Sequence, residues 1–413
     1  MLYRKIPKTG DELSILGFGC MRLPEKGRKI DEKRASKQIH YAIDHGVNYI
    51  DTAMPYHMGA SEPFLGLVLA NGYRDKVKLA TKLLPMYVKT HMDMDRLLNS
   101  QLDRLNTDHI DYYLLHGLDG RSWEMIKQYD VFKFLDDARK KGKVINLGFS
   151  FHGDKDIFKE IVDAYDWEVC QIQYNYLDEQ NQAGKEGLEY AAAKRLGVII
   201  MEPLRGGNLT LNVPQSIKDI WDEANIKRTP AEWAFRWVWD HPEVTTVLSG
   251  MNDEMHIDEN IRIANEAYPN SLNDEELNLI NTVKNRYRDL MSVGCTGCRY
   301  CMPCPEGVNI PMCFEIYNNM NVFGNRGMSR LMYLAWLGDV MTEEPSYASL
   351  CKDCGKCEKV CPQHLPIPEL LKDVVVDLEV WWMKPVVRIA RHVMGIQRWR
   401  SLRRARRLER QNK

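Results

Sequence analysis

Short apolar runs alternate with longer amphipathic stretches over the first two thirds of the chain. Eight runs rich in Val, Ile and Leu have the length and character of strands that are covered on both faces: residues 15–20, 47–52, 77–81, 110–116, 144–150, 169–174, 198–202 and 245–249. The stretches between them have helical periodicity, and Asp31 and Gly46 stand where a helix over 35–45 would begin and end. The alternation predicts an α/β fold.

Eight strand–helix units in succession favour a closed (β/α)8 TIM barrel. The alternative is an open doubly wound sheet, but no Gly-x-Gly-x-x-Gly follows an early strand. One more helix is predicted over 273–290, after which the composition changes to cysteine, proline and glycine. We therefore expect a barrel domain over 1–291, a small ferredoxin-like domain of helices and loops over 292–372, and a C-terminal tail over 373–413.

Composition limits the class of protein. The chain has 413 residues, of which 44% are hydrophobic and 27% charged, so a large core is expected and global disorder is not. The N-terminus has no apolar stretch of signal-peptide type, and no apolar run reaches the roughly 18 residues of a membrane-spanning helix. We expect a cytoplasmic location. Eleven cysteines in such a chain favour metal ligation over disulfides.

Eight of the cysteines fall in two short runs. The first is Cys295-x2-Cys298-x2-Cys301-x2-Cys304-Pro305, and the second is Cys351-x2-Cys354-x2-Cys357-x3-Cys361-Pro362. The second has the spacing of bacterial ferredoxins, in which three thiolates hold one iron–sulfur cluster and the fourth, beside proline, reaches the other. The first run departs from that spacing by one residue before Cys304, and 46 residues separate the runs.

The ferredoxin pattern predicts two [4Fe–4S] clusters. One would be held by Cys295, Cys298, Cys301 and Cys361, and the other by Cys304, Cys351, Cys354 and Cys357. Zinc is the alternative metal, but it does not explain triple runs that end in Cys-Pro. The three remaining thiols, Cys20, Cys170 and Cys313, are expected to be packing residues.

The ends of three predicted strands carry polar residues in a specific pattern. Strand two ends in Asp51-Thr52-Ala53-Met54-Pro55-Tyr56, and Gly59-Ala60-Ser61-Glu62 with Gly66 follows. Strand three ends in Lys82, and strand four in His116. Over residues 11–265 this pattern resembles the aldo-keto reductases. With the cysteine runs, the whole chain resembles the members of that family that carry a C-terminal 4Fe–4S ferredoxin-type domain.

The resemblance implies a catalytic tetrad of Asp51, Tyr56, Lys82 and His116, and a small carbonyl or alcohol substrate. Tyr56 would exchange a proton with the substrate oxygen, while nicotinamide exchanges hydride. A free phenol has a pKa near ~10, and a neighbouring Lys82 ammonium would lower it. Asp51 would orient Lys82, and His116 would orient the substrate oxygen.

The resemblance also implies a set of residues that contact NAD(H) or NADP(H): Ser150, Gln171, Met201, Pro203, Leu204, Gly206, Ser249, Gly250, Asn252, Glu259 and Asn260. Three positions depart from the family pattern. Phe151 replaces an asparagine, and Met201 replaces an aromatic residue that stacks on nicotinamide. Near Met251 and His256, a firm cation for the 2′-phosphate of NADPH is missing, because histidine is mostly neutral at pH 7. We expect NADH to serve at least as well as NADPH.

Hydride carries two electrons, whereas a [4Fe–4S] cluster takes one at a time, and a flavin normally couples the two. Three explanations stay open: the clusters are structural, they relay electrons to a second site such as an electron-carrier protein, or a flavin replaces nicotinamide. The leading interpretation is an oxidoreductase with an iron–sulfur electron-transfer module. The rival is an electron-transfer protein, flavin-linked in one version, whose barrel is a docking or sensing scaffold.

The tail is strongly basic. Residues 384–413 carry eleven Lys or Arg and one acid, a charge of +10, which leaves −11 on the rest of the chain because the total is −1. Apolar residues at helical spacing are interleaved with the arginines. A peripheral membrane contact, a subunit or carrier contact, and packing on the acidic body all fit this pattern. Nucleic-acid binding is not expected, because no reading motif accompanies the charge.

Overall fold

The computed structural model describes residues 1–380 apart from 28, 212, 296, 298, 339–343 and 362, together with residue 385. Contacts divide the chain into two compact units. The first joins Met1–Gly206 with Arg228–Asn273, and the second joins Gly207–Lys227 with the described residues that follow Asn273. The predicted helix over 273–290 is present, and by contacts it groups with the second unit. The basic helix expected in the tail lies outside the described residues.

All eight predicted strands are confirmed. They are parallel and close into a barrel in the order β10-β11-β12-β3-β6-β7-β8-β9, as the sequence analysis expected. Their bounds are β3 Leu16–Gly19, β6 Tyr49–Asp51, β7 Lys78–Leu83, β8 Ile110–Leu118, β9 Val144–Phe151, β10 Val169–Gln173, β11 Gly197–Met201 and β12 Val244–Ser249. Because both faces of such strands are covered, their sequences are continuous apolar runs and do not alternate between polar and apolar residues. These runs made the strands predictable.

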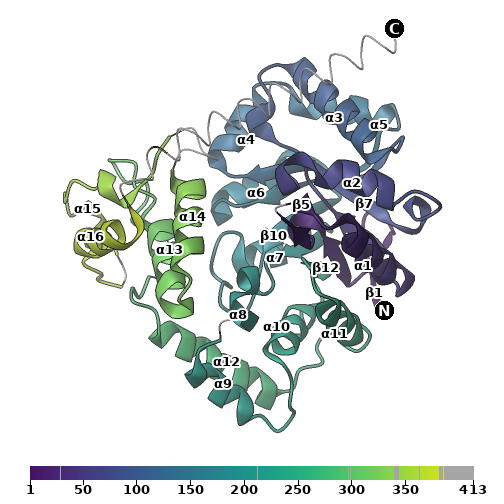
Figure 1. Ribbon diagram of the computed structural model, residues 1–413. Helices are drawn as coiled ribbons and strands as arrows, with labels where there is room; N and C mark the ends of the chain where they lie inside the picture. The colour runs from purple at the N-terminus through teal and green to yellow at the C-terminus, as the bar shows by residue number, and fades with distance from the viewer. Residues whose placement is uncertain are drawn as a thin grey trace. The chain divides into compact units, whose positions relative to one another are not determined.

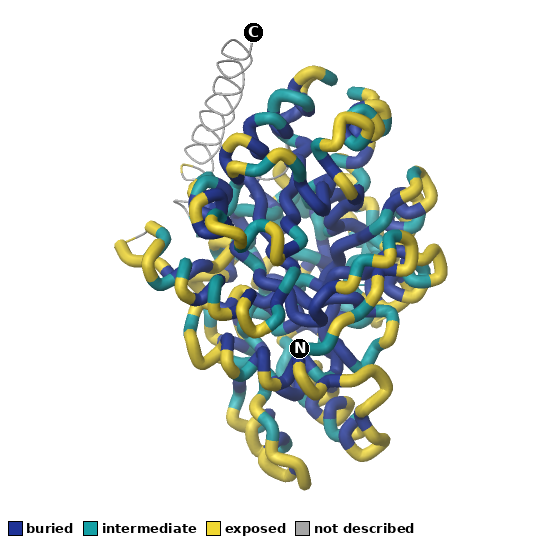
Figure 2. Tube along the Cα trace, turned by 90° about the vertical axis from the view of Figure 1, so that its right-hand side faces the viewer, coloured by how far each residue is buried: buried dark blue, intermediate teal, exposed yellow. Residues whose placement is uncertain are grey.

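Helices surround these strands, as Figure 1 shows for the first unit. They are α1 Glu32–Asp44, α2 Ser61–Val68, α3 His91–Leu105, α4 Gly120–Lys127, α5 Val131–Lys140, α6 Lys155–Ala164, α7 Gly184–Ala193, α10 Pro230–Trp239 and α11 Glu254–Ala264. The expected cap of α1 is present, since the Asp31 side chain accepts a hydrogen bond from the Arg34 backbone N–H. Buried positions lie along the strands and the inward helix faces, and exposed positions gather in the outer turns (Figure 2).

An antiparallel hairpin of β1 Tyr3–Lys5 and β2 Glu12–Ser14 was not predicted. Leu13 in β2 and Ile6 after β1 are fully buried, and they cluster with barrel-strand residues that include Tyr49 and Val169, the first residues of β6 and β10. The hairpin therefore covers the amino end of the barrel. A second short ribbon, β4 Glu25–Lys26 with β5 Lys29–Ile30, follows β3.

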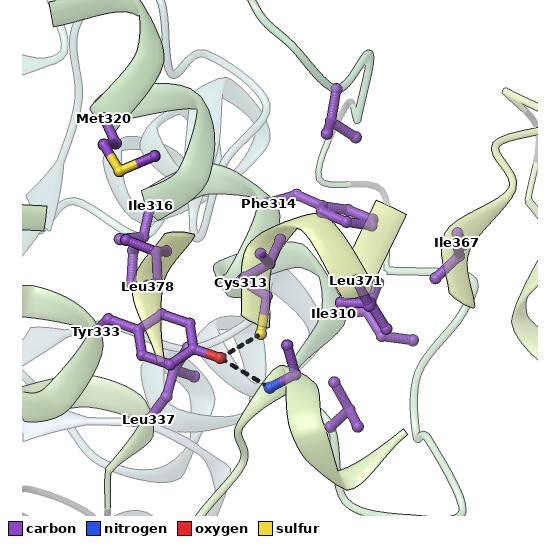
Figure 3. Packing of buried hydrophobic residues seen from close by; sticks show 14 of the residues in the cluster. Ile310, Cys313, Phe314, Ile316, Met320, Tyr333, Leu337, Ile367, Leu371 and Leu378 are labelled. Atoms are coloured by element: carbon purple, nitrogen blue, oxygen red, sulfur yellow. Dashed lines mark hydrogen bonds between the residues drawn. The ribbon is translucent and has the colours of Figure 1, made fainter. Parts of the chain in front are cut away.

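The second unit is helical. Its helices are α8 Asn208–Leu211, α9 Gln215–Asp222, α12 Asp274–Asp289, α13 Ile310–Phe323, α14 Arg326–Leu337, α15 Lys356–Lys359 and α16 Ile367–Leu378. Helices α13, α14 and α16 share one apolar core, in which the Tyr333 hydroxyl meets Cys313 Sγ at 3.9 Å and the Ala348 backbone N–H at 2.8 Å (Figure 3). The described part of the chain contains no helix that is long and apolar enough to cross a membrane.

Candidate active site and cysteine-lined cavities

Three of the four predicted catalytic side chains meet at the carboxyl ends of β6 and β7. Lys82 Nζ lies 2.6 Å from Asp51 Oδ1, 2.9 Å from the Thr52 carbonyl oxygen and 3.4 Å from the Tyr56 hydroxyl. Lys82 and Asp51 are 1% and 2% exposed. The phenol, the ammonium and the carboxylate are thus one hydrogen-bonded group at the end of the barrel that carries the chemistry in this fold.

The motif around Tyr56 holds its loop in place. The Thr52 and Ser61 hydroxyls are 2.8 Å apart, which ties the end of β6 to the start of α2. Glu62 accepts from the Thr81 hydroxyl at 2.7 Å and from Arg104 Nε at 2.7 Å, so it joins α2 to β7 and α3. These buried, satisfied bonds fix the backbone on both sides of the site.

His116, at the end of β8, lies beside the phenol. Its ring stands edge-on to the Tyr56 ring, with centroids 6.1 Å apart. Burial, with the positive charge of Lys82 and the nearby His152, holds the pKa of His116 well below its usual value. Its Nδ1 is buried and has no hydrogen-bond partner among the described residues. The imidazole is therefore neutral, and a neutral ring can donate through one nitrogen.

The charge state of the cluster follows from burial and pairing. Burial pulls the pKa of Lys82 down, but Asp51 and Tyr56 outweigh it and the pKa is raised, so the ammonium persists. Burial raises the pKa of Asp51 against the opposing effect of Lys82. For Tyr56, burial outweighs the lowering by Lys82, and the net pKa is raised. The expected lowering effect of Lys82 is present, but the expected net direction was wrong.

Two loops at this end of the barrel each contain two non-glycine residues with left-handed backbone. After β6, His57 and Met58 have φ of 49° and 56°. After β11, Glu202 and Arg205 have φ of 54° and 50°. Left-handed conformations of non-glycine residues are costly and persist where the surrounding structure imposes them, commonly at functional sites.

The predicted cofactor residues all lie at the carboxyl ends of β9–β12 or in the segments that follow. Ser150 is in β9, Gln171 in β10, Met201 in β11 and Ser249 in β12. The loop after β11 carries Pro203, Leu204 and Gly206, the loop after β12 carries Gly250 and Asn252, and α11 carries Glu259 and Asn260.

Some of these residues have spare hydrogen-bonding capacity. Gln171 Oε1 is buried and has no partner among the described residues, so it could accept from a carboxamide. Ser150 Oγ accepts from the Gly117 backbone N–H at 2.7 Å and can still donate. Asn260 instead bonds Ser249 at 3.1 Å, and Glu259 accepts from the Thr229 hydroxyl at 2.6 Å. The residues fit a nicotinamide end better than they fit an adenosine end.

The cysteines of the second unit line two cavities. Lining the first are Cys295, Cys301 and Cys361. Lining the second are Cys301, Cys304, Cys351, Cys354 and Cys357. Cys298 lies outside the described residues. Apart from the shared Cys301, each cavity has the described thiols of one predicted cluster, including the fourth cysteine of the opposite run.

Cys304 thus faces the second cavity despite the irregular spacing before it. Across the described part of the chain, no three Cys, His, Asp or Glu side chains converge as ligands of a single ion would. The three other thiols, Cys20, Cys170 and Cys313, are fully buried in packed surroundings.

The model of the aldo/keto reductase family matches residues 15–284, which is more than half of the chain. The chain belongs to the aldo/keto reductase family. Residues 294–365 match a second family, described as a 4Fe-4S dicluster domain. The protein is therefore an aldo/keto reductase-type oxidoreductase with a C-terminal 4Fe–4S domain.

Relatives of this aldo/keto reductase cover the barrel. A 6-dehydroglucose reductase of Novosphingobium aromaticivorans is 29% identical over 280 residues, which is 62% of this chain and 88% of the relative. An uncharacterized oxidoreductase, YrpG, of Bacillus subtilis is 30% identical over 51% of this chain and 68% of its own length. The holo form of aldo-keto reductase AKR11C1 from Bacillus halodurans has the same fold, with a TM-score of 0.57 at 24% identity over 68% of this chain and 96% of its own.

Several polar residues at the barrel mouth were not predicted. They are Arg22 after β3, His152 after β9, Asp178 after β10, and Glu202 and Arg205 after β11. The sequence placed these residues directly after predicted strands, but no motif indicated a role for them. Their pairing joins different loops, which sequence spacing alone does not reveal.

Proposed function

We propose that this aldo/keto reductase catalyses nicotinamide-linked interconversion of a small carbonyl compound and its alcohol at the barrel mouth, while its C-terminal domain carries two [4Fe–4S] clusters for electron transfer. The observation that carries the proposal is the contact of the Tyr56 hydroxyl with Lys82 Nζ, itself paired with Asp51. A phenol beside a buried ammonium is suited to give and take a proton at an oxygen.

Each side chain has a separate task. Because burial raises its pKa, Tyr56 stays protonated at neutral pH and can donate to the carbonyl oxygen as negative charge develops there. Lys82 stabilises the phenolate that remains, and Asp51 keeps Lys82 charged and in position. Neutral His116 offers an N–H to the same oxygen. In alcohol oxidation the phenolate takes the proton back. The bound nicotinamide supplies or accepts the hydride.

The cofactor pocket would use Gln171 and Ser150 for the carboxamide, because Gln171 has a buried acceptor without a partner. Met201, at the end of β11, would provide an apolar contact where relatives stack an aromatic ring. The proposal of two clusters in the second domain is supported by the division of its thiols between two cavities. Each cluster would exchange one electron at a time with a carrier protein.

The test is Tyr56→Phe, matched with Tyr268→Phe, because Tyr268 is 57% exposed. We expect Tyr56→Phe to lower carbonyl turnover by roughly 10²–10⁴-fold, since it removes the proton donor. Iron content should be unchanged, and Tyr268→Phe should behave as wild type. Undiminished turnover in Tyr56→Phe would disprove the proposal and favour a barrel that serves as a docking or sensing scaffold.

A further inference from the structure

Arg205 is a buried guanidinium with unused donors. Its residue surface is 6% exposed, and its Nη2 lies 3.3 Å from Asp178 Oδ1. Its Nε and Nη1 are buried and have no hydrogen-bond partner among the described residues. Leaving buried charged donors unsatisfied is costly. An acceptor from outside the chain would remove that cost.

The orientation of Arg205 is fixed in advance. Asp178 Oδ2 accepts from Gln173 Nε2 at 3.1 Å and from Asn175 Nδ2 at 2.9 Å, so the carboxylate that holds the guanidinium is itself immobile. The Arg205 backbone N–H donates to the Glu202 carbonyl oxygen at 3.0 Å. Both residues adopt the left-handed conformation described above. A strained loop and a held counter-ion are typical of a preorganised binding group.

Polar contacts connect Arg205 to the catalytic histidine along one side of the mouth. Gln173 Oε1 accepts from Gln182 Nε2 at 2.8 Å, and Gln182 lies near the His152 ring. His152 lies close enough to His116 to lower its pKa. These residues follow or end consecutive strands, so Arg205 belongs to the same ring of side chains as the proposed reaction centre.

Hydrogen bonds also connect the residues on the other side of the mouth. Arg22, after β3, donates from Nη1 to the Gly206 carbonyl oxygen at 2.6 Å. The next residue, Leu23, donates its backbone N–H to His57 Nε2 at 3.1 Å, and His57 adjoins Tyr56. Two guanidiniums therefore meet at the loop after β11, and only one of them is paired with Asp178.

Glu202 is an acidic side chain near Arg205, and its carboxylate would compete with a ligand anion for the guanidinium. Burial raises its pKa, Asp178 raises it further, and Arg22 and Arg205 oppose that rise. A carboxyl of this kind takes up a proton more readily than an exposed one, so a ligand anion can sit beside it without full like-charge repulsion.

We propose that Arg205 binds an anionic oxygen of the compound that occupies the barrel mouth, so that this compound carries a carboxylate or a phosphoryl group. The inference rests on the proposed function, because it takes the mouth as the reaction site. The anion has two sources: a carboxylate on the carbonyl substrate, or the diphosphate of the dinucleotide. The Nε and Nη1 of Arg205 each have an N–H group without a partner among the described residues, and a carboxylate or a diphosphate supplies anionic oxygens that can accept from them.

The test measures binding rather than turnover, by calorimetry on the anaerobic full-length protein with its clusters. The probes are inorganic pyrophosphate and pyruvate. The variants are Arg205→Gln, Asp178→Asn and, as the matched control, Arg195→Gln. Arg195 precedes β11 at the opposite end of the same strand, is exposed and also has a positive φ of 64°. It therefore loses the same charge in a similar backbone, away from the mouth.

We expect Arg205→Gln to weaken binding of one probe by about 10- to 100-fold, as the loss of a charge-assisted pair does. Asp178→Asn should strengthen it, because Arg205 loses its counter-ion, and Arg195→Gln should change nothing. Loss confined to pyrophosphate assigns the anion to the dinucleotide, and loss confined to pyruvate assigns it to the substrate. The double variant Arg205→Gln/Asp178→Asn leaves no unpaired charge, so weak binding by this variant cannot be ascribed to misfolding.

Binding of neither probe by the wild type, equal binding by Arg205→Gln, or weakening by Asp178→Asn would overturn the inference. Its failure is distinguishable from failure of the proposed function, which is decided by turnover in Tyr56→Phe. Anion binding at Arg205 can persist in a barrel that reduces no carbonyl, and a working reductase can lack it.

Discussion

Breaking the Asp51–Lys82 pair should make the stability of the barrel depend on pH in a predictable direction. In Lys82→Met the Asp51 carboxylate keeps its place, 2% exposed, without the ammonium that lay 2.6 Å away. Burial already raises the pKa of Asp51 against the effect of Lys82, so removing Lys82 raises it further. Removing one partner of a buried pair costs about 3–5 kcal/mol.

The sign follows from proton linkage. A carboxyl whose folded pKa exceeds its unfolded value of ~4 loses stability as pH rises between the two values, by about 1.4 kcal/mol per unit. In the wild type the raised pKa of Lys82 gives stability that is present below its unfolded value of ~10.5 and is lost only as pH rises through the folded value. The stability gap between wild type and Lys82→Met should therefore widen from pH 5 to pH 8.

The assay is anaerobic urea unfolding followed by circular dichroism at both pH values. Lys133→Met is the matched control, because Lys133 and Asp137 form a pair at 2.7 Å with side chains 67% and 34% exposed. It should cost little at either pH. The double variant Asp51→Asn/Lys82→Met has no carboxyl at this position, so its gap to the wild type should not widen from pH 5 to pH 8. A gap of equal size at pH 5 and pH 8 in Lys82→Met, or one no larger than in Lys133→Met, would refute this reasoning.

Three further outcomes are expected. Cys304→Ser should lose about half of the protein-bound iron, because Cys304 lines the second cavity. Cys313→Ser should keep all of the iron, because Cys313 lies in the apolar core. Iron analysis of the two purified variants measures the difference. Steady-state kinetics should show kcat/KM for NADH at least equal to that for NADPH, because no firm cation near Met251 and His256 pairs with the 2′-phosphate. A strong preference for NADPH would contradict this expectation. Gly66→Ala should destabilise the barrel by about 1–3 kcal/mol in urea, because its Cβ would lie 2.5 Å from the Arg104 carbonyl oxygen, while Gly294→Ala, in open space, should be neutral.

The sequence was sufficient for the barrel, because buried parallel strands leave apolar runs that can be recognised without tertiary information. The family resemblance implied Asp51, Lys82 and His116 as site residues, and the structure has them at the carboxyl ends of successive barrel strands. The ferredoxin pattern likewise anticipated that Cys361 would line the cavity of the first run.

What the sequence could not supply were properties that depend on packing. The three-residue strands β1 and β2 are too short to show a period, so the hairpin was missed. The pair of Asp178 and Arg205 joins two loops 27 residues apart. The raised pKa of Tyr56 reflects how deeply the phenol is buried, and the charge of Lys82 alone suggested the opposite direction.

We propose that one polypeptide carries both a nicotinamide-linked Tyr56–Lys82 centre and two iron cubanes. Quantitation of iron, acid-labile sulfide and flavin in anaerobically purified protein would decide the cofactor content. We expect about eight iron and about eight sulfide per chain and no flavin. Zinc in place of iron, absence of sulfide, or flavin in equal amount to the chain would contradict it.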